Sequence, residues 1–263
     1  MTITPGLCSI TFRTLSTDDV IDVAGRAGVG GIEWGADVHA PPGAGPSITA
    51  LGARTRDAGL AVVSYGSYVG MGPTGDEIDA VLDTAEALGS PMVRIWTELG
   101  VTPRSPVTER RRVTERTAVL AERIVARGLL PTLEFHPGTL TETAASANEL
   151  LDAIGPTALR THWQPDPSLG PQTALGELSA VTAHLAHLHV FAWGAGGIDD
   201  RRPLADGAAL WTRALELADR DGAGVPGGRY ALCEYVLDDD PDQFVADVRA
   251  LRSWIDDIDH GRQ

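Results

Sequence analysis

The sequence is poor in basic residues, in aromatic residues and in cysteine. It carries 21 lysine and arginine residues against 36 aspartates and glutamates, which gives a formal net charge of −15. This charge repels nucleic acid and anionic membrane surfaces, because both are bound through basic patches. The two cysteines, Cys8 and Cys233, have no CxxC or zinc-finger spacing, and two thiols make no disulfide framework. We therefore expect no nucleic-acid partner, no membrane partner and two buried, reduced thiols.

Long apolar runs are also missing. No stretch is long enough to span a bilayer, and the chain does not begin with a basic segment followed by an apolar one. We therefore expect a cytoplasmic protein. The composition, 43% apolar and 22% charged, is typical of a globular chain with a substantial core. A length of 263 residues fits two domains, or one (β/α)8 barrel of about 250 residues.

Eight short, β-rich segments alternate with helical segments along the chain. We expect strands at Gly6–Phe12, Ile32–Trp34, Leu60–Tyr65, Pro91–Trp96, Leu159–Trp163, Leu185–Phe191 and Tyr230–Val236, and a fifth strand that opens the stretch Leu129–Thr139 and ends at Glu134 and His136. Strands that alternate with helices pair in parallel. Eight such pairs without a linker predict an α/β fold, a single (β/α)8 TIM barrel over residues 1–263. An open doubly wound sheet is the alternative, but neither glycine cluster, at Gly28 or Gly194, has the GxGxxG spacing that would favour it.

Polar side chains gather where four consecutive strands end. The stretch LLPTLEFHPGT places Glu134 and His136 at one strand end, and they point to the same side because they are two residues apart. Gln164, His189 and Glu234 occupy similar positions on the next three strands. The active site of such a barrel lies at these ends. Two carboxylates, an imidazole and an amide oxygen suit a divalent cation such as Mn²⁺, Mg²⁺ or Co²⁺.

Each of these residues also has a purely structural explanation. Glu134 could be a surface glutamate, His136 a turn residue and His189 a hydrogen-bonded histidine of the barrel. We interpret three other histidines as structural: His162, His184 and His187. His162 is expected on the opposite side of its strand from the tryptophan that follows it.

Four of the six tryptophans fall at or just after a strand end: Trp34, Trp96, Trp163 and Trp193. Any one of them could fill the core. Four tryptophans at the carboxyl-end opening of the barrel are more than core filling requires. Flat aromatic faces suit the C–H faces of a sugar or another ring. We therefore predict that these tryptophans contact substrate.

Six sequence blocks resemble a known family. In order and spacing, GIEW, VRIW, LEFHPGT, HLHVFAW, RRPLADG and ALCEYV resemble the strand-end blocks of the xylose isomerase-like barrels, the sugar phosphate isomerase/epimerase group. The resemblance covers essentially the whole chain. It implies a divalent metal held by Glu134, Gln164, His189 and Glu234, with the two glutamates as the acid/base pair. One glutamate removes a proton beside a carbonyl, the metal stabilises the enediolate, and the other glutamate returns the proton at the same or the neighbouring carbon.

The resemblance also implies residues that bind substrate. Arg94 and His136 would orient substrate oxygens, and Glu33 would bind a hydroxyl group. The pair Arg201 and Arg202 could bind a phosphate or carboxylate of the substrate, or could be solvated surface arginines.

The sequence departs from the family pattern after the sixth strand. The family usually has an aspartate where this chain has Gln164, and a substrate-binding histidine where it has Pro167. Loss of one negative charge predicts weaker metal binding. Asp166 could take the place of the missing aspartate if the strand ends later.

We therefore predict an isomerase or epimerase that acts on a small sugar or related polyol. A lyase, a dehydratase or a bond-cleaving enzyme could use the same site, because a proton removed beside a carbonyl also leads to loss of a leaving group. A degenerate, non-catalytic sugar-binding barrel is a third reading, and a homo-oligomer is compatible with all three. A DNA-repair nuclease of the same superfamily would need a basic groove, which the net charge of −15 disfavours.

Overall fold

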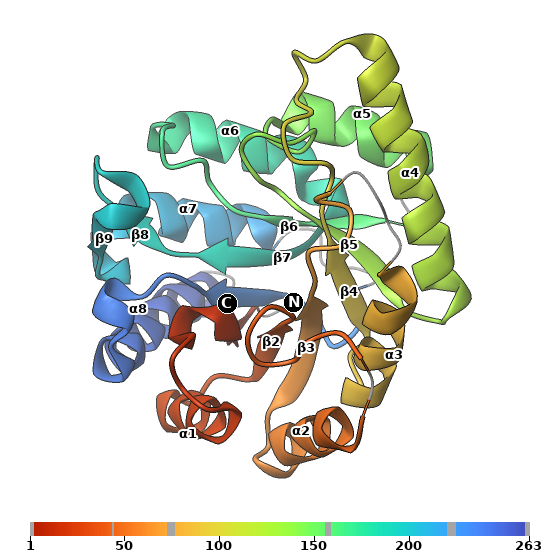
Figure 1. Cartoon of the computed structure of the whole chain (residues 1–263). Helices are drawn as coiled ribbons and strands as arrows, with labels where there is room; N and C mark the ends of the chain where they lie inside the picture. The colour runs from red at the N-terminus through yellow and green to blue at the C-terminus, as the bar shows by residue number, and fades with distance from the viewer. Residues whose placement is uncertain (1–2, 44, 73–76, 156–158, 220–224, 261–263) are drawn as a thin grey trace.

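The chain folds into a closed barrel of eight parallel strands surrounded by helices, as the sequence predicts (Figure 1). The computed structural model describes residues 3–43, 45–72, 77–155, 159–219 and 225–260. The barrel strands are β1 (Thr4–Cys8), β2 (Gly31–Gly35), β3 (Ala61–Gly66), β4 (Met92–Ile95), β5 (Leu130–Glu134), β6 (Arg160–Trp163), β7 (Leu185–Val190) and β10 (Tyr230–Cys233). They pair in chain order, and β1 closes the ring by pairing with β10.

Each barrel strand is followed by a helix that covers its outer face. The helices are α1 (Thr17–Ala27), α2 (Pro46–Asp57), α3 (Ile78–Leu88), α4 (Val107–Ala126), α5 (Ala144–Ile154), α6 (Pro171–Val181), α7 (Ala208–Ala218) and α8 (Pro241–His260). Local signals fix several ends. Ser16 caps α1 through a capping box, and Gly28 ends it with a φ of 73°. No helix of the described ranges is long and apolar enough to cross a membrane.

Alternation along the strands separates an apolar outer layer from a polar interior. Outward side chains such as Ile32, Tyr65, Leu133 and Val190 pack with the helices in one large core. Inward side chains at the carboxyl end are polar or charged and nearly fully buried. Burial of charge costs free energy unless the charges are paired, so this interior must be organised by ion pairs and hydrogen bonds.

Several short elements depart from the expected pattern. The first strand ends at Cys8, and the expected continuation to Phe12 is a 3-10 helix, Ser9–Phe12. The loop after β7 contains a hairpin of two-residue strands, β8 (Ala192–Trp193) and β9 (Arg201–Arg202). Further 3-10 turns lie at Thr182–His184, Gly197–Asp199, Leu204–Gly207 and Leu237–Asp239. The hairpin and the first 3-10 helix both lie at the carboxyl-end mouth of the barrel.

Candidate active site at the carboxyl ends of the strands

The four residues expected to hold a metal all lie at the carboxyl-end mouth of the barrel, in two contacting pairs. Gln164 Nε2 donates a hydrogen bond to Glu134 Oε1 at 3.2 Å. His189 Nδ1 lies 3.4 Å from Glu234 Oε2. All four side chains are buried, with at most 6% of the residue surface exposed. Each comes from a different strand of the run β5, β6, β7 and β10.

Arg94, on β4, connects the four expected ligands to the other buried charges of the barrel interior. Its guanidinium forms ion pairs with Glu134 and, at 3.1 Å, with Glu33. Only 1% of its surface is exposed. Gly66 on β3 leaves the room for it, because a Cβ there would lie 2.6 Å from Arg94 Nη2. Arg94 therefore fixes two carboxylates, and it reaches substrate only if one of these ion pairs opens.

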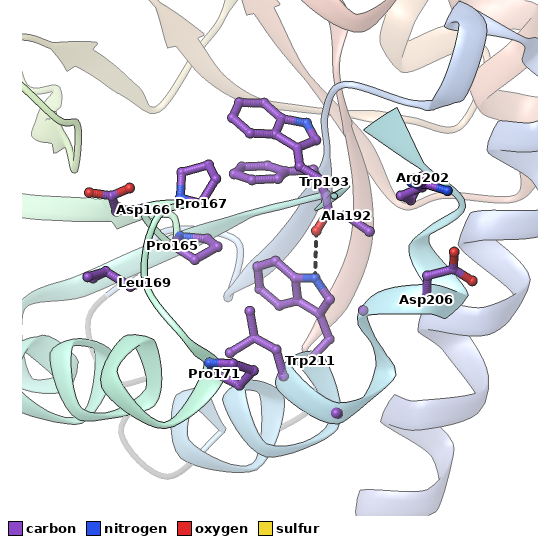
Figure 2. Close-up of a pocket in the computed structure, with 14 residues that line it drawn as sticks. Pro165, Asp166, Pro167, Leu169, Pro171, Ala192, Trp193, Arg202, Asp206 and Trp211 are labelled. Carbon is purple, nitrogen blue, oxygen red and sulfur yellow. Dashed lines mark hydrogen bonds between the residues drawn. The ribbon is translucent and has the colours of Figure 1, made fainter. Parts of the chain in front are cut away.

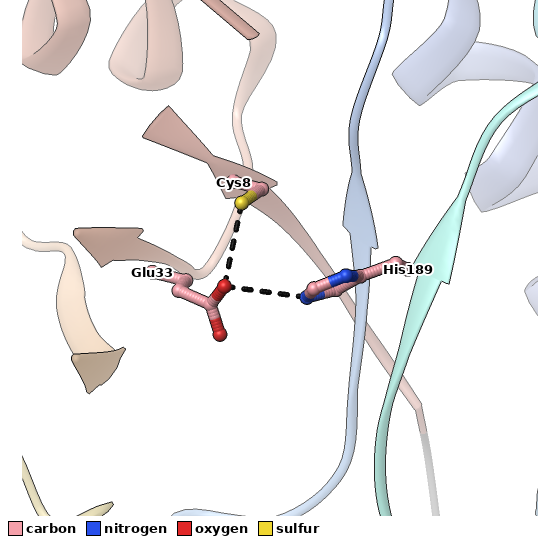
Figure 3. Close-up of side chains that lie close together, drawn as sticks. All are labelled: Cys8, Glu33 and His189. Atoms are coloured by element: carbon pink, nitrogen blue, oxygen red, sulfur yellow. Dashed lines mark hydrogen bonds and ion pairs between the residues drawn. The ribbon is translucent and has the colours of Figure 1, made fainter. Parts of the chain in front are cut away.

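Glu33 lies too deep in the barrel interior to bind a substrate hydroxyl group. It is fully buried and contacts Cys8 at 3.3 Å and His189 at 3.3 Å (Figure 3). It also lies 3.2 Å from His162. Ser64 also donates to it, which is possible because the β2–β3 register shifts beside Glu33. The expectation that Glu33 binds a substrate hydroxyl is therefore not met: its carboxylate is surrounded by protein groups.

The pKa shifts follow from this arrangement. Burial alone raises the pKa of Glu33, but Arg94 and His189 outweigh it and hold the pKa well below its usual range. Burial lowers the pKa of His189, yet the carboxylates of Glu234 and Glu33 raise it to about 9. For His162, burial wins and lowers the pKa to about 4. Without a cation, His189 is therefore protonated at neutral pH, whereas His162 is neutral.

The donor set fits a divalent cation. Of the described residues, none donates a hydrogen bond to the buried Gln164 Oε1, and the buried Glu234 Oε2 lies 3.4 Å from His189 Nδ1. The interior holds three carboxyl groups, from Glu33, Glu134 and Glu234, against one guanidinium. A divalent cation that displaces the His189 proton would balance these formal charges. Buried acceptors without donors and an excess of carboxylates are what a cation requires.

A second group of side chains overlaps with this set. Cys8, Glu33 and His189 each offer one ligand atom, and the three atoms lie within 4.8 Å of one another (Figure 3). Burial and the neighbouring Glu33 raise the pKa of the Cys8 thiol well above its usual value. Arg94 also contacts the same Glu33 oxygen. A cation among these three would have to displace the proton of a thiol whose pKa is raised, so the strand-end set, which contains no thiol, is the better candidate.

Aromatic side chains border the mouth on two sides. The ring of Trp96 lies 4.4 Å from His136 and 6.0 Å from Tyr68. Across the mouth, Trp193 of the hairpin stacks on Phe191 at 4.5 Å and contacts Tyr235 at 5.0 Å. Trp96, His136 and Trp193 thus lie where the sequence predicts.

Trp34 and Trp163 lie elsewhere, so the expectation that they contact substrate is wrong. Trp34 points to the helix layer and donates to Thr55 on α2 at 3.2 Å. Trp163 packs edge-on against Trp211 of α7, with the ring centres 6.1 Å apart. Neither exposes any surface. Each is adjacent in sequence to an inward residue, and strand alternation sends it outward.

Arg201 lies on the hairpin at the mouth of the barrel, and an aspartate already neutralises its charge. Its Nη1 is 2.5 Å from Asp239, and its guanidinium lies over the Tyr235 ring, 5.4 Å from the centre. The next residue, Arg202, lines a cavity of about 230 Å³ between the loop after β6 and the start of α7 (Figure 2). Its walls are largely apolar and include Pro165, Phe191 and Trp211.

Sequence reasoning missed several residues of the site. Cys8, Ser64 and His162 complete the shell around Glu33, and only strand parity could have indicated them. Phe191 and Tyr235 complete the aromatic border. Tyr235 directly follows Glu234 and has a φ of 52°, a left-handed conformation rare for a bulky residue. This backbone turn starts the loop that returns toward the hairpin.

Comparisons with known proteins agree with this architecture. The family model described as xylose isomerase-like TIM barrel matches residues 21–254. No curated protein sequence matches the chain significantly. Among solved structures, a probable 3-DHS dehydratase involved in petrobactin synthesis in Bacillus anthracis has a TM-score of 0.78 at 16% identity, covering 95% of this chain and 99% of that one.

Two further structures have similar folds. A 3-keto-D-glucoside 4-epimerase from E. coli has a TM-score of 0.69 at 15% identity, covering 95% of this chain and 99% of its own. A xylose isomerase-like TIM barrel protein from Mycobacterium smegmatis, in complex with magnesium, has a TM-score of 0.67 at 14% identity and covers 97% of each chain. At these identities the likeness shows the fold.

Proposed function

The chain belongs to the xylose isomerase-like TIM barrel family, and from this premise we propose that it is an isomerase or epimerase of a sugar or related polyol. The reaction is a proton transfer at a carbon next to a carbonyl group. The observation that carries the proposal is that Glu134 and Glu234 are both buried at the carboxyl ends of β5 and β10, one on each side of Gln164 and His189 in the strand order.

The two glutamates differ in their partners, which suits them to different tasks. Glu134 receives donors from Arg94 and Gln164, so its negative charge is stabilised. Glu234 contacts His189 at 3.4 Å and the Cys8 thiol at 3.9 Å, and among the described residues no guanidinium pairs with it. A carboxylate without a guanidinium partner is the better proton acceptor. We assign Glu234 the proton removal and Glu134 the proton return.

Glu134, Gln164, His189 and Glu234 would hold a divalent cation, of which Mn²⁺, Mg²⁺ and Co²⁺ suit the ligands. Such a cation supplies positive charge where negative charge develops on a substrate oxygen. Glu33 accepts from His189 Nε2 at 3.3 Å and thereby leaves Nδ1, which faces Glu234, as the ligand atom. Trp96 and Trp193 would pack against the sugar ring and exclude water.

A dehydratase is the second candidate, and the fold likeness to a probable 3-DHS dehydratase motivates it. Removal of the same proton leads to water loss when a leaving group lies on the next carbon. Product masses separate the two reactions, because isomerisation keeps the substrate mass and dehydration lowers it by one water.

The test is deuterium exchange from D₂O into ketose substrates by Mn²⁺-loaded protein, with the Glu134→Gln and Glu234→Gln variants beside it. We expect each variant to lose at least 1,000-fold in exchange rate, since general acid–base catalysis typically contributes 10² to 10⁴. Asp247→Asn is the matched control, because Asp247 is a buried carboxylate on α8 that accepts hydrogen bonds from Leu204 and Gln243 and not from the proposed ligands.

Retention of exchange in both glutamine variants would contradict the mechanism. Metal content gives an independent check: about one cation per chain is expected, together with a melting temperature that falls in EDTA. With Co²⁺, a strong thiolate charge-transfer band would instead indicate that Cys8 is a ligand and would move the cation to the Cys8, Glu33 and His189 group.

A further inference from the structure

The loops after β7 and β10 form the place where (β/α)8 barrels frequently bind a substrate phosphate. In this protein a cavity of about 570 Å³ lies between them. Its charged lining consists of Asp199, Asp200, Asp238 and Asp239 against Arg201 and Arg202. Four carboxylates against two guanidinium groups make this cavity negative.

Both of its arginines are already neutralised. Arg201 pairs with Asp239 at 2.5 Å, and Arg202 pairs with Asp200 at 2.7 Å. The chain contains no lysine, so no ammonium group can bind an anion here. A phosphate would therefore have to break an existing ion pair and then lie beside the remaining aspartates.

The other arginines of the mouth are engaged in the same way. Arg13 pairs with Asp37, which also accepts a hydrogen bond from Tyr68 at 3.2 Å. Arg94 is buried between Glu33 and Glu134. The cavity beside α7 offers mainly apolar walls, and its one arginine is again Arg202. Every arginine that borders the mouth or these cavities thus has a carboxylate partner.

We propose that the substrate is an uncharged sugar and that the site excludes phosphorylated and carboxylated sugars. The inference rests on the proposed function and adds the substrate class. The mouth offers what an uncharged ring needs: aromatic faces at Trp96 and Trp193 and an apolar recess at Phe191 and Trp211. The excess of aspartates repels an anionic group before it reaches the carboxylates of the interior.

Matched pairs of ketoses test the proposal: D-ribulose, D-fructose and D-tagatose against D-ribulose 5-phosphate, D-fructose 6-phosphate and D-tagatose 6-phosphate. Deuterium incorporation by the Mn²⁺-loaded protein is measured by mass spectrometry at low ionic strength. We expect kcat/KM to be at least tenfold higher for the uncharged member of any pair that reacts. Added salt should narrow this difference, because it screens exposed charges.

The double variant Asp199→Asn with Asp238→Asn should reduce the preference about tenfold, since it removes the excess of carboxylates. Its matched control is Asp256→Asn with Asp257→Asn, which changes the net charge equally on an exposed part of α8 away from the mouth. A control that reduces the preference as much would show a general charge effect and overturn the assignment to these loops.

Equal or faster exchange with a phosphorylated member would overturn the proposal. If no pair reacts, the proposed function fails, and sulfate binding then decides the charge inference. A saturable rise of melting temperature below 1 mM sulfate that Arg201→Gln abolishes would reveal an anion site and contradict it. The absence of any such rise would support it.

Discussion

At the scale of single residues, Gln164 is the position at which the proposed cation site departs from the family pattern. Its amide nitrogen points to Glu134, and its amide oxygen has no donor among the described residues. An amide oxygen can serve as a metal ligand but brings no charge. In the proposed site the number of charged ligands therefore falls by one relative to the family pattern.

Gln164→Asp should increase Mn²⁺ affinity about tenfold, because the number of charged ligands tunes the affinity of oxygen sites. Isothermal titration of metal-free protein measures it. Gln164→Asn is the matched control, since it has the size of aspartate without its charge. Equal gains in both variants would mean that side-chain length, and not charge, limits binding.

At the scale of strands, the site depends on the space that a small residue on one strand leaves for a large side chain on the next. β3 ends in a glycine where β4 contributes Arg94, and the backbone of Gly66 is not in the left-handed region. Gly66→Ala is therefore allowed by the backbone, but its Cβ would lie 2.6 Å from Arg94 Nη2 and 3.1 Å from Glu33 Oε1. The substitution acts on the site through these side chains.

We expect Gly66→Ala to destabilise the protein by about 1–3 kcal/mol, the usual cost of overpacking, and to reduce exchange activity more than tenfold. Urea unfolding and deuterium exchange measure the two effects. Gly72→Ala is the control, because a Cβ there meets no atom within 4 Å. Unchanged activity in Gly66→Ala would show that Arg94 can shift without consequence for Glu33 and Glu134.

The strands themselves were predictable, because eight β-rich segments alternate with helical ones. The direction in which each strand side chain points was harder to predict. A tryptophan next to an inward glutamate or histidine faces outward, so Trp34 and Trp163 belong to the core although they stand at strand ends. The hydrophobic pattern of the sequence does not indicate the β2–β3 register shift or the two-residue strands of the hairpin. Ion pairs such as Arg94 with Glu33 join strands distant in sequence, and only the closed barrel reveals them.

At the scale of the whole molecule, the buried charges make stability depend on pH. The pKa of His189 is about 9 in the folded, metal-free protein, against an ordinary value of 6.5. A raised histidine pKa means that its contribution is fully present below pH 6.5 and is lost as pH rises toward 9. Histidines with lowered pKa values, such as His162, change the free energy of unfolding only below about pH 6.5. They therefore do not offset the loss of stability above that pH.

The free energy of unfolding of metal-free protein should therefore fall between pH 6.5 and 9, by at most about 1.4 kcal/mol per pH unit. Urea unfolding at constant ionic strength measures it. His189→Gln should flatten the dependence in this window. Stability that stays constant or rises between pH 6.5 and 9 in the wild-type protein would contradict the prediction.

The closure of the barrel also has a consequence during synthesis. β1 pairs with β10, so Leu7 meets Cys233 across more than two hundred residues of intervening chain. A ribosome adds about 5 to 20 residues per second, so the first strand waits roughly 10 to 50 seconds for its last neighbour. Until then one edge of the sheet stays open, and Cys8 and Glu33 lack Glu234 beside them. The nascent chain is thus exposed to edge-to-edge aggregation, and the candidate site is complete only after the last strand has been added.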